Sequence, residues 1–197
     1  MKSVQLVWAH PRVDSMTAHV VDAVRDELSR LDVAVAELDL YRAGFDPVLL
    51  PSDEPDWENL DKTYSDETMR LADDLRTRDT IIFVFPIWWF SIPAMLKGYI
   101  DRVWNYGIAY GNRRRLPIKT HRWIGLAGEP ESAFNKRGLG EAMMRHLNVG
   151  ISGYCGAEDS EVVCLYDVLG GATDDIVAHH AALIEQARNV VRQLAVK

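Results

Sequence analysis

The chain alternates short apolar runs with longer amphipathic stretches, and this alternation limits the possible folds more than any other feature. The apolar runs have the length of β-strands and lie at residues 3–9, 33–38, 80–85, 122–127 and 161–166. The stretches with apolar side chains at helical spacing lie at residues 16–31, 67–75, 92–104, 136–147 and 173–194. Strands that alternate with helices predict a parallel sheet covered by helices on both faces. Five strands fit the doubly wound order 2-1-3-4-5.

This topology also predicts where a ligand binds. In doubly wound sheets the ligand lies outside the carboxyl ends of the strands, at the switch between strands 1 and 3. We therefore expect the chemistry in the loops after strands 1, 3 and 4, at residues 10–17, 86–91 and 128–137. Residues 51–67 are acidic and rich in turn formers, which is typical of a surface excursion. No linker or repeat divides the chain, so we expect a single domain over residues 1–197.

Composition excludes several classes of function. The net charge is −7, from 29 acidic and 22 basic residues, which disfavours nucleic acid as a partner. The longest apolar run, residues 81–90, is too short for the ~18 residues of a membrane span, so no stable membrane insertion is expected. The first residues have no signal-peptide pattern, and we expect a cytoplasmic protein with Cys155 and Cys164 as reduced thiols.

Several catalytic motifs are missing from the sequence. There is no GxxxxGK[ST] phosphate loop, no complete GxGxxG, no GxSxG elbow and no HExxH zinc helix. A nucleotide hydrolase, a standard dinucleotide-binding domain and an ordinary serine hydrolase are therefore disfavoured. We predict no metal site.

The loop after the first strand carries groups suited to an anion. Ser15 and Thr17 stand where a helix begins, and the free N–H groups and dipole of a helix N-terminus favour a phosphate. His10 and Arg12 add possible positive charge. The alternative is plain helix capping by Asp14 or Ser15.

The loop after the third strand holds three consecutive aromatic residues, Trp88, Trp89 and Phe90. Three neighbours at a strand end cannot all point into one core, so at least one must face the crevice or a partner chain. Such a group offers a flat wall to a planar ring. The alternative places Trp88 and Phe90 in the core and makes Trp89 a dimer anchor.

Here the sequence resembles a known family. Residues 85–104, FPIWWFSIPAMLKGYIDRVW, followed by GIAYG at 107–111, closely resemble the flavodoxin-like NAD(P)H:quinone oxidoreductases. That family includes the diaphorase-type quinone reductases and the ancillary reductases of bacterial potassium-efflux systems. Residues 9–17 and 38–47 are similar to the same family.

The resemblance implies a bound flavin and a set of site residues. The phosphate side of the flavin would be held by His10, Ser15, Met16 and Thr17. The edge and face of the isoalloxazine ring would be lined by Pro86, Ile87, Trp88, Trp89 and Phe90. The ring and ribityl chain would also meet Ala127, Gly128 and Glu129. The catalytic candidate, Tyr110, would lie in the substrate pocket and face the flavin of the partner subunit.

The resemblance further implies ping-pong hydride transfer from NAD(P)H through the flavin to a quinone or similar acceptor, in a homodimer with shared active sites. The short chain favours FMN, with FAD as a close alternative. Phe134 and Gly140 stand where diaphorase-type members have a tyrosine and a histidine, so no proton relay of that kind is expected.

Three further alternatives stay open. One alternative is a flavin-binding regulatory or ancillary subunit of a transport system. Another is an electron carrier, which the aromatic loop disfavours because it indicates a pocket rather than an exposed flavin edge. The basic residues 113–115 form a solvated loop, or they contact the extra phosphate of NADPH.

Overall fold

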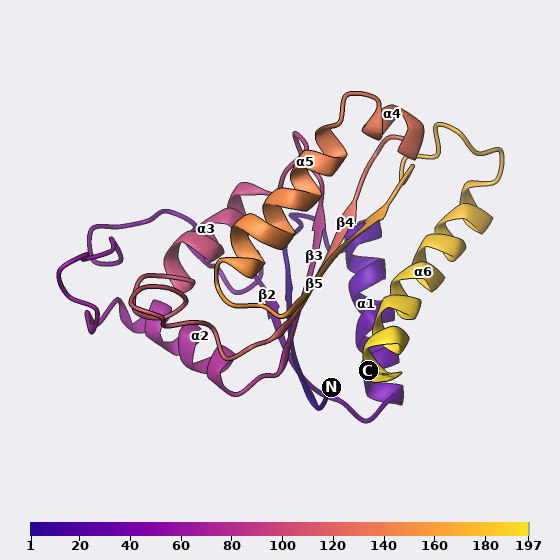
Figure 1. The fold of residues 1–197 in the computed structure, drawn as a ribbon. Helices are drawn as coiled ribbons and strands as arrows, with labels where there is room; N and C mark the ends of the chain where they lie inside the picture. The colour runs from indigo at the N-terminus through magenta and orange to yellow at the C-terminus, as the bar shows by residue number, and fades with distance from the viewer. Residues whose placement is uncertain (197) are drawn as a thin grey trace.

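The computed structural model describes residues 1–196, and a five-stranded parallel sheet in the order β2-β1-β3-β4-β5 forms its centre (Figure 1). The strands are β1 (Ser3–Trp8), β2 (Ala34–Asp39), β3 (Thr80–Pro86), β4 (Thr120–Leu126) and β5 (Asp159–Leu165). All four neighbouring pairs are parallel. The predicted flavodoxin-like doubly wound fold is confirmed.

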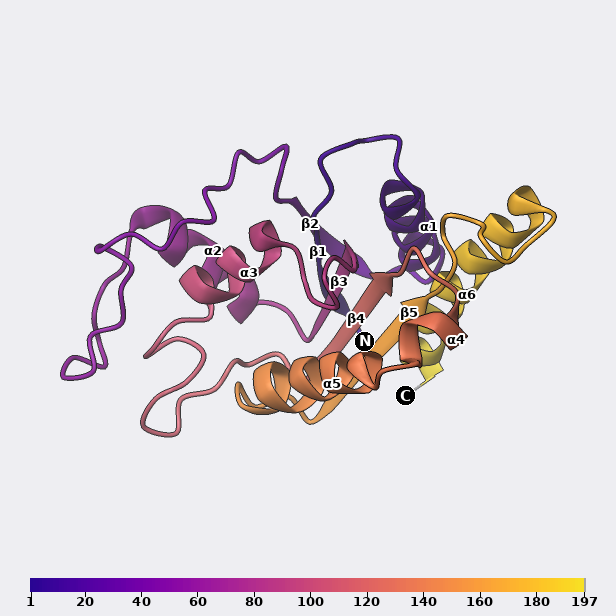
Figure 2. The same cartoon turned by 90° about the horizontal axis from the view of Figure 1, so that it is seen from above.

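Helices cover both faces of the sheet. They are α1 (Met16–Arg30), α2 (Asp66–Arg76), α3 (Ala94–Val103), α4 (Glu131–Asn135), α5 (Leu139–Arg145), the π-helix η1 (His146–Gly153) and α6 (Ile176–Val196). Helices α1 and α6 lie side by side on one face, whereas α2, α3 and α5 lie on the other (Figures 1 and 2). Within residues 1–196 no helix is both long enough and apolar enough to cross a bilayer.

Two apolar cores hold the layers together. One packs Val20, Val24 and Leu28 of α1 and the buried face of α6 against the sheet. The other lies under α2, α3 and η1, where Trp123 stacks on Phe83 with ring centroids 4.1 Å apart. Every residue of β3 is buried, as its unbroken apolar run predicts for a central strand.

Helix ends follow local capping chemistry in some places and differ from expectation in others. Ser15 caps α1 and Ser65 caps α2, each accepting a hydrogen bond from a backbone N–H three residues on. Helix α3 begins at Ala94, two residues later than predicted, because Pro93 has extended backbone angles (φ −59°, ψ 152°) and occupies the N-cap position.

The predicted helix over 136–147 is wrong in its extent. Helix α4 ends at Asn135, before the predicted span begins. The span itself contains α5 and the first two residues of η1, which continues to Gly153. A π-helix is rare beyond a single turn, and no sequence motif signals this one. Its buried Ser152 accepts a hydrogen bond of 2.9 Å from the indole N–H of Trp123, so η1 is tied directly to the sheet.

Candidate active site

A cavity of about 540 Å³ opens at the carboxyl ends of β1, β3 and β4. Its size falls within the range of small-molecule sites, about 300–1,000 Å³. The cavity joins the loop that precedes α1 to the loop that follows β3. The lining residues are His10, Arg12, Asp14, Ser15, Met16, Thr17, His19, Pro86, Ile87, Trp88, Leu126, Gly128, Val168, Leu169 and His180.

Two residues in the first turn of α1, Met16 and Thr17, line this cavity. Ser15 accepts from the amide of Ala18 (3.2 Å) and donates to the carbonyl of Arg12 (3.0 Å), so it caps the helix. Within residues 1–196 the amides of Met16 and Thr17 donate to no other group. The cap and an anion site are therefore compatible, because capping consumes the Ser15 hydroxyl and leaves these two amides free.

One arginine, Arg42, fixes the loop that carries His10. Arg42 donates to the carbonyl oxygens of His10 and Pro11, at 2.5 and 2.9 Å. Desolvation by burial lowers the pKa of His10, and the nearby charges of Arg12 and Arg42 act in the same direction. His10 is thus held mainly neutral at pH 7, and it offers a hydrogen bond rather than a full charge.

The aromatic loop forms a tight turn. Trp88 and Ser91 exchange backbone hydrogen bonds of 3.1 and 3.0 Å, and the two residues between them have φ values of 53° (Trp89) and 54° (Phe90). Positive φ at both central residues is the type I′ geometry that normally selects Asn-Gly. Two bulky residues here cost conformational energy, and such strain concentrates at functional sites.

The turn decides where each aromatic ring points. The Trp89 side chain is 94% exposed and that of Trp88 is 42% exposed. The interpretation that places Trp88 in the core is wrong, because Trp88 lines the cavity. Phe90 is half-buried and packs on Phe134 with centroids 4.9 Å apart.

A second cavity of about 210 Å³ adjoins the first. Three residues, Ile87, Gly128 and Leu169, line both cavities, and the two together are called the cleft. The remaining residues that line the second cavity are Trp89, Phe90, Ala127, Glu129 and Phe134. All twelve predicted flavin contacts therefore lie along this cleft.

The sequence reasoning missed the loop after β5, which supplies one wall. Asp167 (φ 58°) donates its amide to the carbonyl of Glu129 (2.9 Å), and its carboxylate accepts from the amides of Gly171 and Ala172. These bonds place Leu169, 82% exposed, beside Gly128. The loop carries no motif, and its position after a fifth strand end was the one available signal.

Tyr110 lies apart from the loops of its own chain that were predicted to contact a flavin. It lines a cavity of about 260 Å³ between α3 and η1. Its ring lies 5.6 Å from that of Tyr154, which is 61% exposed. Burial raises the pKa of Tyr110, and neighbouring Tyr154 adds to the shift, so the phenol stays protonated at neutral pH.

Two other sequence features have local explanations. A Cβ at Gly140 would overlap the side chain of Asn135 and crowd the ring of Phe134, so position 140 has no room for a larger side chain. In the basic run, the Arg114 guanidinium pairs with Asp61 and donates to the carbonyl of Gly107 (3.0 Å). Arg114 is therefore engaged within the chain.

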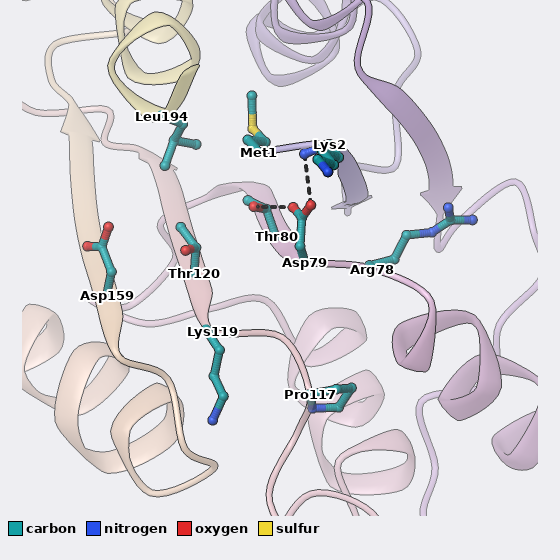
Figure 3. A pocket seen from close by; sticks show the side chains of 10 residues that line it. All are labelled: Met1, Lys2, Arg78, Asp79, Thr80, Pro117, Lys119, Thr120, Asp159 and Leu194. Carbon is teal, nitrogen blue, oxygen red and sulfur yellow. Dashed lines mark hydrogen bonds between the residues drawn. The ribbon is translucent and has the colours of Figure 1, made fainter. Parts of the chain in front are cut away.

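A cavity of about 450 Å³ lies at the opposite end of the sheet, at the amino ends of the strands (Figure 3). There the carboxylate of Asp79 accepts from the amide of Lys2 (2.8 Å) and from the hydroxyl of Thr80 (2.8 Å). Burial raises the pKa of Asp79, but these hydrogen bonds outweigh it and lower the pKa overall. Asp79 thus binds the first residues of the chain to the sheet. This structural role accounts for the carboxylate at this cavity without a ligand.

The fold and the cleft together define a doubly wound α/β protein with a cleft at the switch point. The profile of the "Flavodoxin-like fold" family matches residues 2–188. The "Uncharacterized NAD(P)H oxidoreductase YcaK" of Escherichia coli K12 is 44% identical over 192 residues, which is 97% of each chain. The solved "NAD(P)H:quinone oxidoreductase from Methanothermobacter marburgensis" superposes with a TM-score of 0.86 and 27% identity, covering 98% of this chain and 96% of that one.

An FMN-dependent NADH-azoreductase from Bacillus anthracis, solved with FMN, shares the fold at a TM-score of 0.71 and 18% identity, over 99% of this chain and all (100%) of that one. The protein described here belongs to the flavodoxin-like family of NAD(P)H:quinone oxidoreductases and is an enzyme of that type.

Proposed function

We propose that this enzyme binds FMN in the cleft and transfers reducing equivalents from NAD(P)H to a quinone by a ping-pong mechanism. The observation that carries the proposal is the pair of adjoining cavities that make up the cleft, with free amides at one end and an aromatic turn at the other. A flavin mononucleotide needs both ends, since its phosphate is an anion and its ring is planar. The residues present therefore fit the group.

Each end of the cleft has a distinct task. The amides of Met16 and Thr17 bind the phosphate, with help from the dipole of α1 and the neutral imidazole of His10. Trp88, Ile87 and Gly128 border the ring. The strained turn fixes Trp89 at the mouth of the cleft, where it limits the approach of water and of the nicotinamide.

The bound flavin supplies the redox chemistry, accepting a hydride from NAD(P)H and passing two electrons to the acceptor. The chain supplies orientation, because hydride transfer needs reacting atoms about 3–3.5 Å apart. Glu129 is the one ionisable residue that lines the second cavity within the described chain. With phenylalanine at 134, protons for the reduced acceptor come from water rather than from a tyrosine relay.

The test of the function is direct. The purified protein should be yellow, and mass spectrometry should identify the released cofactor as FMN. NAD(P)H should bleach the colour, and a quinone should restore it. A protein that binds flavin but turns over no acceptor would support a regulatory subunit or an electron carrier instead. FAD as the released cofactor would correct the FMN assignment and leave the reaction intact.

Replacing Trp89 with alanine should weaken FMN binding about tenfold without changing the unfolding midpoint. The side chain is 94% exposed, so its loss removes little packing. One aromatic stacking contact contributes about 0.5–1.5 kcal/mol. Fluorescence titration with FMN measures the affinity. Unchanged affinity together with dissociated subunits would make Trp89 a dimer anchor and remove it from the flavin site.

The active enzyme is a homodimer in which each subunit completes the other's pocket. Tyr110 lies in a cavity separate from its own chain's flavin loops, and Tyr154 beside it is exposed. An aromatic wall at the surface suits a two-fold interface, where each chain gives the same patch to its partner. Tyr110 then stacks on an acceptor that lies over the partner's flavin.

Sedimentation should therefore give a species near twice the 22.3 kDa chain mass at micromolar protein. We expect the interface to bury at least about 1,200 Å² in total. A sharper test mixes Tyr110→Ala subunits with Met16→Glu subunits, whose own flavin site is deficient. In a shared site Tyr110 and the flavin come from different chains, so a mixed dimer contains one site in which both are intact and should regain activity. An active, flavin-loaded monomer would contradict the shared pocket.

A further inference from the structure

The excursion after β2 (residues 51–65) projects beside α2 and α3 and is attached to them by hydrogen bonds (Figure 1). Asp53 is fully buried within it and anchors it from inside. Its carboxylate accepts from the amide and hydroxyl of Ser65 (2.7 and 2.9 Å), from the Thr68 hydroxyl (3.0 Å) and from Nε of Arg102 (3.1 Å). The two ends of the excursion are thereby tied to α2 and α3.

The outer part of the excursion is fastened to the loop that carries Tyr110. The Tyr64 hydroxyl donates to the carbonyl of Tyr106 at 2.7 Å. Gly107 has φ 80°, and a Cβ there would overlap the backbone carbonyl of Leu60. Because the two backbones touch at this point, the excursion and the loop over residues 104–111 form one unit.

Trp57 stands on this unit with its indole 66% exposed. Its ring lies 5.1 Å from that of Tyr106 and 6.3 Å from that of Tyr110. With Tyr154 the four rings form an aromatic row that three separate segments of the chain build. The fold places this indole next to Tyr110 and leaves most of it uncovered.

We propose that Trp57 is a specificity-determining residue that extends the acceptor wall beyond Tyr110 and selects planar acceptors of two or more fused rings. The inference rests on the proposed function, in which Tyr110 faces the acceptor. A one-ring quinone over the flavin reaches Tyr110, whereas a fused-ring quinone that stacks on Tyr110 extends along the row to Trp57. Edge or offset contacts with a second ring then add affinity.

Steady-state kinetics with a one-ring benzoquinone and a two-ring naphthoquinone test the proposal. In Trp57→Ala we expect the KM for the naphthoquinone to rise about tenfold at unchanged kcat, while the KM for the benzoquinone stays within about twofold. Trp57→Phe should restore most of the naphthoquinone KM. Glu58→Ala, a neighbouring exposed substitution, serves as the matched control.

The possible failures are distinguishable. Equal KM changes for the two quinones, or no change for either, would overturn the role of Trp57 while the unmutated enzyme's turnover upholds the proposed function. Loss of the dimer in Trp57→Ala would also overturn it, because Trp57 would then be an interface residue. An unmutated protein that reduces neither quinone would overturn the proposed function and this inference with it.

Discussion

Replacing Asp53 with alanine is expected to lower the free energy of unfolding by about 3–5 kcal/mol. The Asp53 carboxylate is fully buried and pairs with Arg102, whose side chain is 4% exposed. Removing it leaves a buried guanidinium with Glu67, 38% exposed, as its remaining carboxylate partner (3.0 Å). Hydrogen bonds to Ser65 and Thr68 disappear as well. Urea unfolding followed by circular dichroism measures the change.

Asp61→Ala is the matched control for this substitution. Asp61 also pairs with an arginine, Arg114, but its side chain is 80% exposed. An exposed pair contributes about 0–1 kcal/mol, so the midpoint should barely move. If the two variants lose equal stability, the buried pair is not the anchor of the excursion.

The same carboxylate predicts a pH dependence. Burial raises the pKa of Asp53, but hydrogen bonds from Ser65, Thr68 and Arg102 outweigh it, and the net shift is downward. A lowered pKa in the folded state means that the stabilisation is complete above the unfolded value of about 4 and is lost as the pH falls through the folded value. The stability difference between the native protein and Asp53→Ala should therefore shrink in acid.

Replacing Met16 with glutamate should reduce FMN affinity by about a hundredfold and leave the fold intact. Met16 is the first residue of α1, and the first turn of that helix has no acidic residue. A carboxylate there interacts favourably with the helix dipole, by about 0.3–1 kcal/mol. It also repels a flavin phosphate. Two unit charges about 5 Å apart repel by about 3 kcal/mol at an effective dielectric constant of about 20, which corresponds to about a hundredfold in affinity.

Two controls make this result specific. Met16→Gln has nearly the same shape without the charge and should bind FMN normally. Riboflavin has the same ring without a phosphate, so its affinity should be equal for Met16→Glu and Met16→Gln. FMN binding that does not distinguish the two variants would place the phosphate away from the N-terminus of α1.

The sequence by itself determined the fold and predicted where the cleft lies. The apolar run of β3 predicts a strand buried on both faces, and the alternation of strands with helices leaves few topologies open. The strand order in turn fixes which loops meet, so His10, Trp88 and Gly128 could be assigned to one crevice from their positions after strand ends. Ser15 at the start of a helix is an equally local signal.

The tertiary structure alone decided what depends on contacts between distant segments. Leu169 forms a wall because Asp167 bonds to Glu129 and to its own loop. Trp57 stands beside Tyr110 because a buried carboxylate holds the excursion in place. Local patterns encode which face of an element is buried, since burial depends on periodicity. They do not encode which loops touch, because that depends on side-chain packing across residues far apart in the chain.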